Sequence, residues 1–115
     1  YNFTRIDKGQ IKPFTKYAAF DFVRECSYKG YGPVGKGGHL ILWDASELEK
    51  INDEYCVEEF LTGIFLIGSD GSGYAYGVNL RGEFITVPFI GMCDEDIKVV
   101  GKSFDDFIAY VAAIE

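Results

Sequence analysis

The chain has 115 residues, a length that suits one domain with a single core spanning residues 1–115. Hydrophobic residues make up 48% of it, which is enough for a packed interior and excludes wholesale disorder. Acidic residues outnumber basic ones by 18 to 11, a net charge of −7, which argues against nucleic acid as a partner because phosphate binding draws on Lys and Arg.

The first predicted element is a helix from about Pro13 to Cys26. Proline suits the first turn of a helix, where its missing N–H is not needed. Apolar residues then recur at helical spacing, at Phe14, Tyr17, Ala18, Phe22 and Cys26. The glycine-rich segment Lys29–Gly38 is predicted to be a loop, and His39–Trp43 a short apolar strand.

A second helix is predicted shortly after this strand. Either Asp44 or Ser46 is expected to cap it, because each is followed three residues later by a glutamate, as in a capping box. Leu48 and Ile51 are its expected buried positions. Residues Tyr55–Thr62 are interpreted as a connection that leads to the centre of the chain.

The centre of the chain, about residues 63–88, is predicted to be an antiparallel meander of three strands. The apolar run Ile64–Ile67 enters a polar turn at Gly68–Gly73, and a tight reversal at Arg81–Gly82 leads into a third strand, Glu83–Val87. Connections this short cannot make a parallel crossover. Period-two spacing places four side chains on one face of the middle strand: Tyr74, Tyr76, Val78 and Leu80.

The last third of the chain is predicted to end in a helix. After Pro88 the chain bends away, Cys93–Asp96 is exposed and acidic, and Ile97–Val100 is a short strand. Ser103 caps the final helix and Asp106 lies near its positive end. Its apolar stripe consists of Phe104, Phe107, Ile108, Val111 and Ile114. We therefore expect an α+β protein, an antiparallel sheet covered by helices from both ends of the chain.

The cysteines do not predict a metal or redox site, because they are odd in number and far apart. We interpret Cys26, Cys56 and Cys93 as reduced, mostly buried thiols of a cytoplasmic protein without a membrane span or signal sequence. His39, the single histidine, is interpreted as structural, and no cofactor or metal is expected. Since the chain starts at Tyr1 without Met, we expect that an N-terminal piece is missing.

Three short motifs resemble binding loops, and each fails on a required residue. Gly30–Gly37 resembles a P-loop but has Gly where Ser or Thr must follow the lysine. Lys29–Gly32 begins like an RNA-binding strand, but Pro33 replaces the next stacking aromatic residue. Asp70–Gly73 suggests a calcium loop, yet tyrosines stand where further oxygen ligands are needed, so turn chemistry explains it better.

The candidate binding residues are aromatic and acidic, and none is assigned a catalytic role, because the sequence does not report the separation or burial of any carboxylate pair. Tyr74 and Tyr76 either line a groove or pack beneath the terminal helix. The run Asp94–Asp96 is either a partner contact or a solvated loop. The predicted partner-binding residues are Asp70, Tyr74, Tyr76, Asp94, Glu95 and Asp96.

Three blocks of loosely patterned residues follow one another over nearly the whole chain. They are Tyr17–Phe22 with Gly30–Gly35 and Leu40–Trp43; Glu47–Leu48 with Asn52, Tyr55 and Ile67–Gly73; and Val87–Pro88 with Val99–Phe104 and Phe107. In this order they resemble the SUKH superfamily, of the Smi-Knr type. The family usually has more sequence before its first helix than this chain does.

The resemblance implies an α+β fold with a bent, mostly antiparallel sheet, and a role without catalysis. Many bacterial members are similar to immunity proteins, which bind and block a secreted toxin, often a nuclease. We therefore expect a basic cognate toxin as partner, for which an acidic inhibitor is well suited, and a monomer or weak dimer. Two alternatives stay open: a regulatory or scaffold adaptor, as among fungal members, and a small hydrolase or ligand-binding domain that uses a Tyr74–Tyr76 groove.

Overall fold

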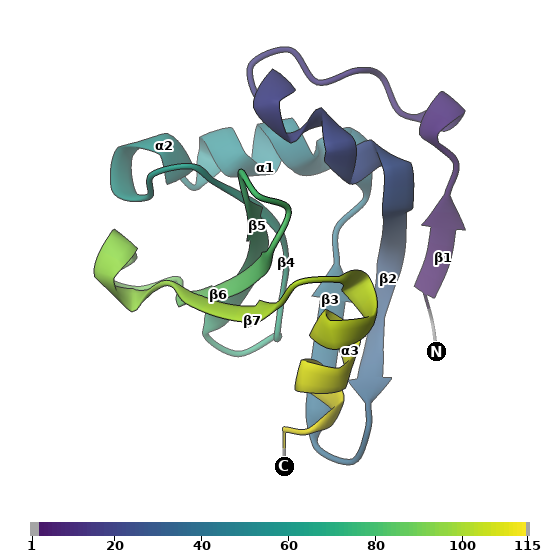
Figure 1. Cartoon of the computed structure of the whole chain (residues 1–115), viewed down its shortest axis with the longest axis vertical. Helices are drawn as coiled ribbons and strands as arrows, with labels where there is room; N and C mark the ends of the chain where they lie inside the picture. The colour runs from purple at the N-terminus through teal and green to yellow at the C-terminus, as the bar shows by residue number, and fades with distance from the viewer. Residues whose placement is uncertain (1–2, 115) are drawn as a thin grey trace.

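Seven strands form one sheet in which their order across the sheet is their order along the chain (Figure 1). The structure, a computed structural model, describes residues 3–114, and only the backbone at Cys26. The strands are β1 (Phe3–Ile6), β2 (Ser27–Val34), β3 (Gly38–Leu42), β4 (Ile64–Ser69), β5 (Tyr74–Asn79), β6 (Phe84–Pro88) and β7 (Lys98–Gly101). Every neighbouring pair is antiparallel, which confirms the predicted α+β class with its antiparallel sheet.

Helical segments lie in the connections β1–β2, β3–β4 and β6–β7, and α3 follows the last strand (Figure 1). The 3₁₀ segments are η1 (Lys8–Gln10), η2 (Ala18–Cys26), η3 (Ala45–Glu47) and η4 (Asp94–Asp96), and the α-helices are α1 (Leu48–Glu54), α2 (Val57–Phe60) and α3 (Phe104–Ala112). Within residues 3–114, no helix combines the length and the apolar character that a membrane crossing requires.

The sheet is strongly bent, so that β2 and β3 run steeply across the direction of β6 and β7 in Figure 1. Two shifts of register accompany the bend, one between Leu66 and Gly68 in β4 and one between Phe84 and Ile85 in β6. Such irregularities increase the local twist of a strand pair. Gly68 is also the point at which β4 approaches β3, since a Cβ there would lie 2.1 Å from the carbonyl oxygen of Ile41.

Apolar side chains are buried on both faces of the central strands, more than a sheet with a single apolar face would bury. One core joins Phe65 and Tyr76 to η2 and to Phe107 of α3, and we call it the first core. The second core lies on the opposite face, where Leu66 and Ile85 pack against α2 and the segment after β6. The helices at the two ends of the chain therefore cover one face, as predicted, and the middle of the chain covers the other.

The predicted face of the middle strand is only partly correct. Tyr76 and Val78 are buried in the first core, whereas Tyr74, on the same face, is 48% exposed. β5 ends at Asn79, so Leu80 lies in the following turn, and it is exposed. The preceding turn is shorter than expected, because Gly68 and its neighbour continue β4.

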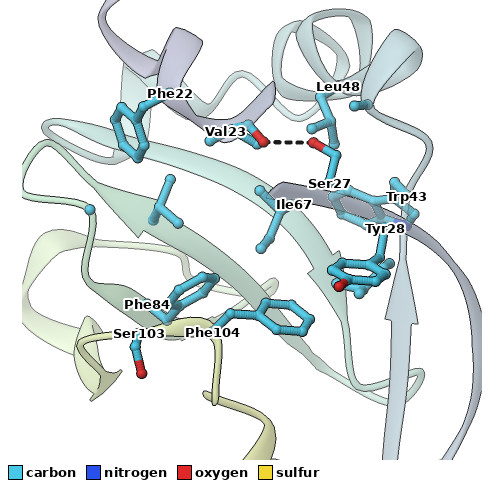
Figure 2. A pocket seen from close by; sticks show the side chains of 14 residues that line it. Phe22, Val23, Ser27, Tyr28, Trp43, Leu48, Ile67, Phe84, Ser103 and Phe104 are labelled. Carbon is cyan, nitrogen blue, oxygen red and sulfur yellow. Dashed lines mark hydrogen bonds between the residues drawn. The ribbon is translucent and has the colours of Figure 1, made fainter. Parts of the chain in front are cut away.

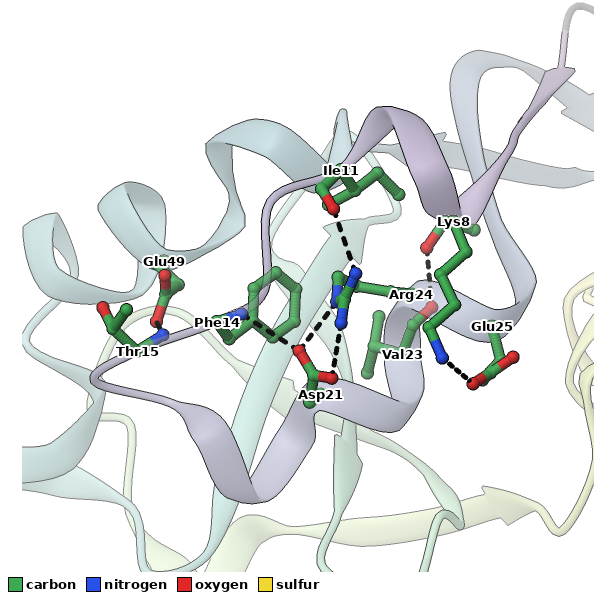
Figure 3. A network of polar contacts seen from close by, with 10 residues as sticks. Lys8, Ile11, Phe14, Thr15, Asp21, Val23, Arg24, Glu25 and Glu49 are labelled. Carbon is green, nitrogen blue, oxygen red and sulfur yellow. Dashed lines mark hydrogen bonds and ion pairs between the residues drawn. The ribbon is translucent and has the colours of Figure 1, made fainter.

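The predicted first helix begins later than expected, at Ala18, and is a 3₁₀ helix. Side-chain hydrogen bonds to the backbone hold the residues before it in a non-helical conformation, as Figure 3 shows. The carboxylate of Asp21 accepts from the backbone N–H of Phe14, and the buried guanidinium of Arg24 donates to the carbonyl of Ile11 and to Asp21. Glu49 of α1 accepts from the N–H groups of residues 15 and 17. These bonds replace the helical bonds that the apolar spacing had suggested.

The predicted loop Lys29–Gly38 is wrong, because most of it is the strand β2. β2 pairs with β1 on one side and with β3 on the other, so its backbone groups have partners although its sequence is rich in glycine. Gly30 and Gly32 take φ angles of 138° and 156°, which favour glycine. The segment that resembles a P-loop, Gly30–Gly37, is thus part of the β2–β3 hairpin, and so is Lys29–Gly32, which resembles an RNA-binding strand.

The second helix is confirmed as α1, and Asp44 caps η3, the 3₁₀ turn that leads into it. The Asp44 carboxylate accepts from the N–H of Ser46 at the start of η3, which continues into α1. The predicted connection that follows contains a further helix, α2, which starts after Cys56. Cys56 has a positive φ of 54° and is exposed, and Cys93 is partly exposed, so the prediction of mostly buried thiols is wrong for both; the side chain of the third cysteine lies outside the described residues.

Asn52 of α1 completes the hydrogen bonding of β4. β3 pairs with β4 only near Gly68, which leaves the edge of β4 at Leu66 without a strand partner. The Asn52 amide is fully buried there; its Oδ1 accepts from the N–H of Leu66 at 2.8 Å and its Nδ2 donates to the Leu66 carbonyl at 2.9 Å. One side chain thus acts as a strand neighbour for one residue.

The terminal helix α3 is confirmed together with its cap. The hydroxyl of Ser103 accepts from the N–H of Asp106, as the sequence predicted. Of the predicted stripe, Phe107 and Val111 are completely buried and the other members are partly buried. Phe107 stacks on Phe84 at a ring separation of 4.9 Å, which fixes α3 against the sheet.

Candidate functional site

A hollow of polar and aromatic character lies where β5 begins and β6 ends, and we call it the tyrosine groove. Its volume is about 480 Å³. Four of the predicted partner-binding residues line it: Asp70, Tyr74, Tyr76 and Asp96. Residues that were not among the predicted partner-binding residues complete the lining: Thr86, Pro88, Lys98, Tyr110 and Ile114.

Strand register builds the floor of the tyrosine groove. Tyr76 lies opposite Thr86, and Thr86 in turn lies opposite Lys98, so these three residues form a row across β5, β6 and β7. Tyr74 lies opposite Pro88 in the next row of the same face. Side chains directly opposite on one face of a sheet are close neighbours.

The tyrosines differ in what they offer to a partner. Tyr74, which is 48% exposed, stands at the rim of the groove, and Tyr110 of α3 lies beneath the Lys98 ammonium group, with Nζ 5.4 Å from the ring centroid. Tyr76 is only 2% exposed and meets Phe107 edge-on at 5.0 Å, so it packs under the terminal helix. Burial, with the charge of Asp70 and the nearby Tyr110, raises the pKa of Tyr76 to about 12.

Asp70 holds the turn between β4 and β5. Its Oδ1 accepts from the backbone N–H groups of Ser72, Gly73 and Tyr74 at 2.8 to 3.1 Å. Partial burial raises the pKa of the carboxyl, but these three donors outweigh it and hold the pKa below its ordinary value. Asp70 therefore stays ionised at the groove while it shapes the turn, in agreement with the turn chemistry predicted for this loop.

The three acidic residues of η4 have different positions relative to the groove. Asp94 accepts from the N–H and the hydroxyl of Thr62, both at 2.7 Å, which holds η4 against the α2–β4 connection and lowers the Asp94 pKa. Asp96 lines the groove and accepts from the Sγ of Cys93 at 3.2 Å. Glu95 is exposed and does not line the groove.

The groove combines aromatic rings with two carboxylates and one ammonium group. Such a lining can receive a cationic side chain, because a ring face and an acidic oxygen both attract positive charge. Among the described residues, no three His, Cys, Asp or Glu side chains lie close enough to hold a metal ion. His39 lies elsewhere, with its ring against the glycine at position 71.

The residues that the sequence missed come from other elements of the chain. Lys98 reaches the groove through the pairing of β7 with β6, and Tyr110 through the packing of α3. Extension of the predicted meander to a fourth strand could have suggested Lys98, since hairpin register determines which residues are opposite. Tyr110 lies three residues after Phe107 and four before Ile114, so helical spacing places it at the flank of the apolar stripe, a signal that could have identified it.

A comparison with models of known protein families gives no match for this chain. A comparison with curated proteins gives none either.

Proposed function

We propose that this chain is a binding protein without catalytic activity, an immunity protein of the SUKH type that neutralises a basic secreted toxin by stoichiometric binding. The ordered sequence blocks and the net charge of −7 support this proposal. The observation that carries it is the tyrosine groove, in which the exposed ring of Tyr74 and the carboxylates of Asp70 and Asp96 line one hollow.

The chemistry of this groove favours a lysine or arginine side chain of the partner. An arginine guanidinium stacks on aromatic rings and pairs with carboxylates, so Tyr74 and Asp96 offer it both kinds of contact. Tyrosine is frequent among residues that dominate binding energy, because it buries a large rigid surface. The acidic charge of the whole chain would also speed the approach of a basic partner.

Co-expression with the toxin encoded beside this chain tests the proposal. We expect the chain to rescue growth and to form a one-to-one complex with the toxin. If the chain neither rescues growth nor forms a complex with the toxin, the proposal is wrong.

Three variants test the role of the groove in that complex by calorimetry. Tyr74→Ala is expected to weaken binding about 30-fold, in the range of a dominant interface residue. Asp96→Asn is expected to weaken it about tenfold through loss of a charged hydrogen bond. Glu95→Gln is the matched control, because it removes the same charge next to the groove and should change affinity less than about threefold at physiological salt. Equal losses for the two acidic variants would mean that only overall charge matters.

A further inference from the structure

A cavity of about 260 Å³, open to solvent on one side, extends into the first core, apart from the tyrosine groove. Its inner surface consists of buried apolar residues: Leu42, Ala45, Leu48, Ile67 and Val78. Aromatic side chains form its walls: Phe22, Tyr28, Trp43, Phe84 and Phe104. Figure 2 shows the ring of Phe22 across from the rings of Phe84 and Phe104, with Ile67 between them.

The lining has few polar side chains, and both of its serine hydroxyls already have a hydrogen-bond partner. The hydroxyl of Ser27 donates to the carbonyl of Val23 at 2.6 Å (Figure 2), and the hydroxyl of Ser103 accepts from the N–H of Asp106. None of the described lining residues carries a charge. A water molecule is stable in a cavity only where it finds several hydrogen-bond partners, so this cavity favours an apolar occupant.

The same lining argues against a peptide segment as the occupant. A peptide brings N–H and C=O groups that must find partners when they are buried, and this lining has few polar side chains to serve as partners. A hydrocarbon body has no such requirement and gains from contact with the aromatic walls. An apolar cavity of roughly 150 Å³ can hold benzene, so 260 Å³ suits a body of two or three rings.

We infer that this cavity binds a neutral, largely apolar small molecule of two or three rings, held between Phe22 and the Phe84–Phe104 pair. The Tyr28 ring, stacked on Phe104 at 5.0 Å, closes the end of the cavity toward a second apolar hollow. Phe22, which is 39% exposed, lies on the solvent side of the cavity together with Ser103, which is exposed, and Gly82, which is partly exposed. This inference goes beyond the proposed partner binding and does not depend on it.

The fluorescent dye N-phenyl-1-naphthylamine is a suitable probe, because it is neutral and of this size. Trp43 is the only tryptophan of the chain and lines the cavity, so it reports on binding by energy transfer to the dye. We expect saturable one-to-one binding with quenching of Trp43. The sulfonated analogue of the dye should bind at least about tenfold more weakly in high salt, where the net charge of the chain is screened. Equal binding of the two dyes, or no saturable binding of the neutral one, would overturn the inference.

Variants at Ile67 locate the site. Ile67→Phe fills the cavity and is expected to weaken binding of the neutral dye at least about tenfold, whereas the matched control Ile67→Val leaves the space open and should bind within about threefold of the unaltered chain. Unweakened binding by Ile67→Phe would overturn the inference. If that variant does not fold, Phe22→Ala, at the partly exposed wall, should weaken binding about fivefold, and no change would count against this site.

Discussion

Replacement of Asn52 by alanine should destabilise the fold more than the loss of any single contact at the surface. The amide is fully buried and serves both backbone groups of Leu66, at 2.8 and 2.9 Å, besides donating to the carbonyl of Leu48 at 2.8 Å. Asn52→Ala leaves the N–H and C=O of Leu66 buried without partners. Each such group costs about 1–3 kcal/mol, so we expect a loss of about 3 kcal/mol in the free energy of unfolding.

Urea unfolding followed by circular dichroism measures this loss. The urea concentration at the midpoint of unfolding should fall. The slope of the unfolding free energy against urea concentration should stay the same, because the variant does not change the surface exposed on unfolding. At roughly 4 °C per kcal/mol for a domain of this size, Tm should fall by about 12 °C. A loss of this size is a large part of the stability of an ordinary domain.

Asn79→Ala is the matched control for this prediction. The Asn79 side chain also accepts from backbone N–H groups, those of Arg81 and Glu83, but in a partly exposed turn. Water can replace those bonds, so a loss of about 1 kcal/mol is expected. If Asn52→Ala costs no more than Asn79→Ala, the amide does not act as the missing strand partner of β4.

Two further predictions concern close backbone approach and acid stability. Gly68→Ala places a methyl group 2.1 Å from the Ile41 carbonyl and should lower the unfolding free energy by about 3 kcal/mol, whereas Gly73→Ala, with open space around it, should change it little when both are compared in urea. Asp21 has its pKa lowered to about 2, because Arg24 and a backbone N–H bond the carboxylate. Its contribution to stability is therefore complete above about pH 4 and is lost as pH falls through 2, so Asp21→Asn should flatten the acid limb of a plot of urea midpoint against pH. An unchanged acid limb would contradict the stabilising role of the bond between Asp21 and Arg24.

Local patterns predicted the elements that local forces determine. The terminal helix has a capping serine and an apolar stripe at helical spacing, and both function in the structure as the sequence suggested. The central meander follows from short glycine turns between apolar runs. In each case neighbouring residues carry the information, and the fold does not override it.

Long-range pairing explains the elements that the sequence did not reveal. β2 looks like a loop because Gly30 and Gly32 weaken any strand, yet strands on both sides hold it extended. The helix expected from Pro13 begins only at Ala18, because Arg24, within the expected helix, and Glu49, in α1, bind the preceding backbone. The contact with Glu49 spans more than 30 residues, so a local window of sequence does not contain it.

The candidate site was partly predictable for the same reason. Tyr74 and Tyr76 share a strand and Asp70 its turn, so their neighbourhood follows from local structure. Asp96 reaches the same groove from a separate segment, while Glu95, its immediate neighbour, does not line it. Only the three-dimensional path of the chain distinguishes these two acidic residues.

The strictly sequential order of the seven strands has a consequence for biosynthesis. As the nascent polypeptide leaves the ribosome, each new strand finds the edge of its predecessor already available, and none must wait for a later segment to separate two earlier ones. Proteins whose contacts are close in sequence fold faster than those with distant contacts. The first core also needs α3, which follows the last strand, because Phe107 and Val111 of this helix are buried in it, so this core is complete only once α3 has left the ribosome.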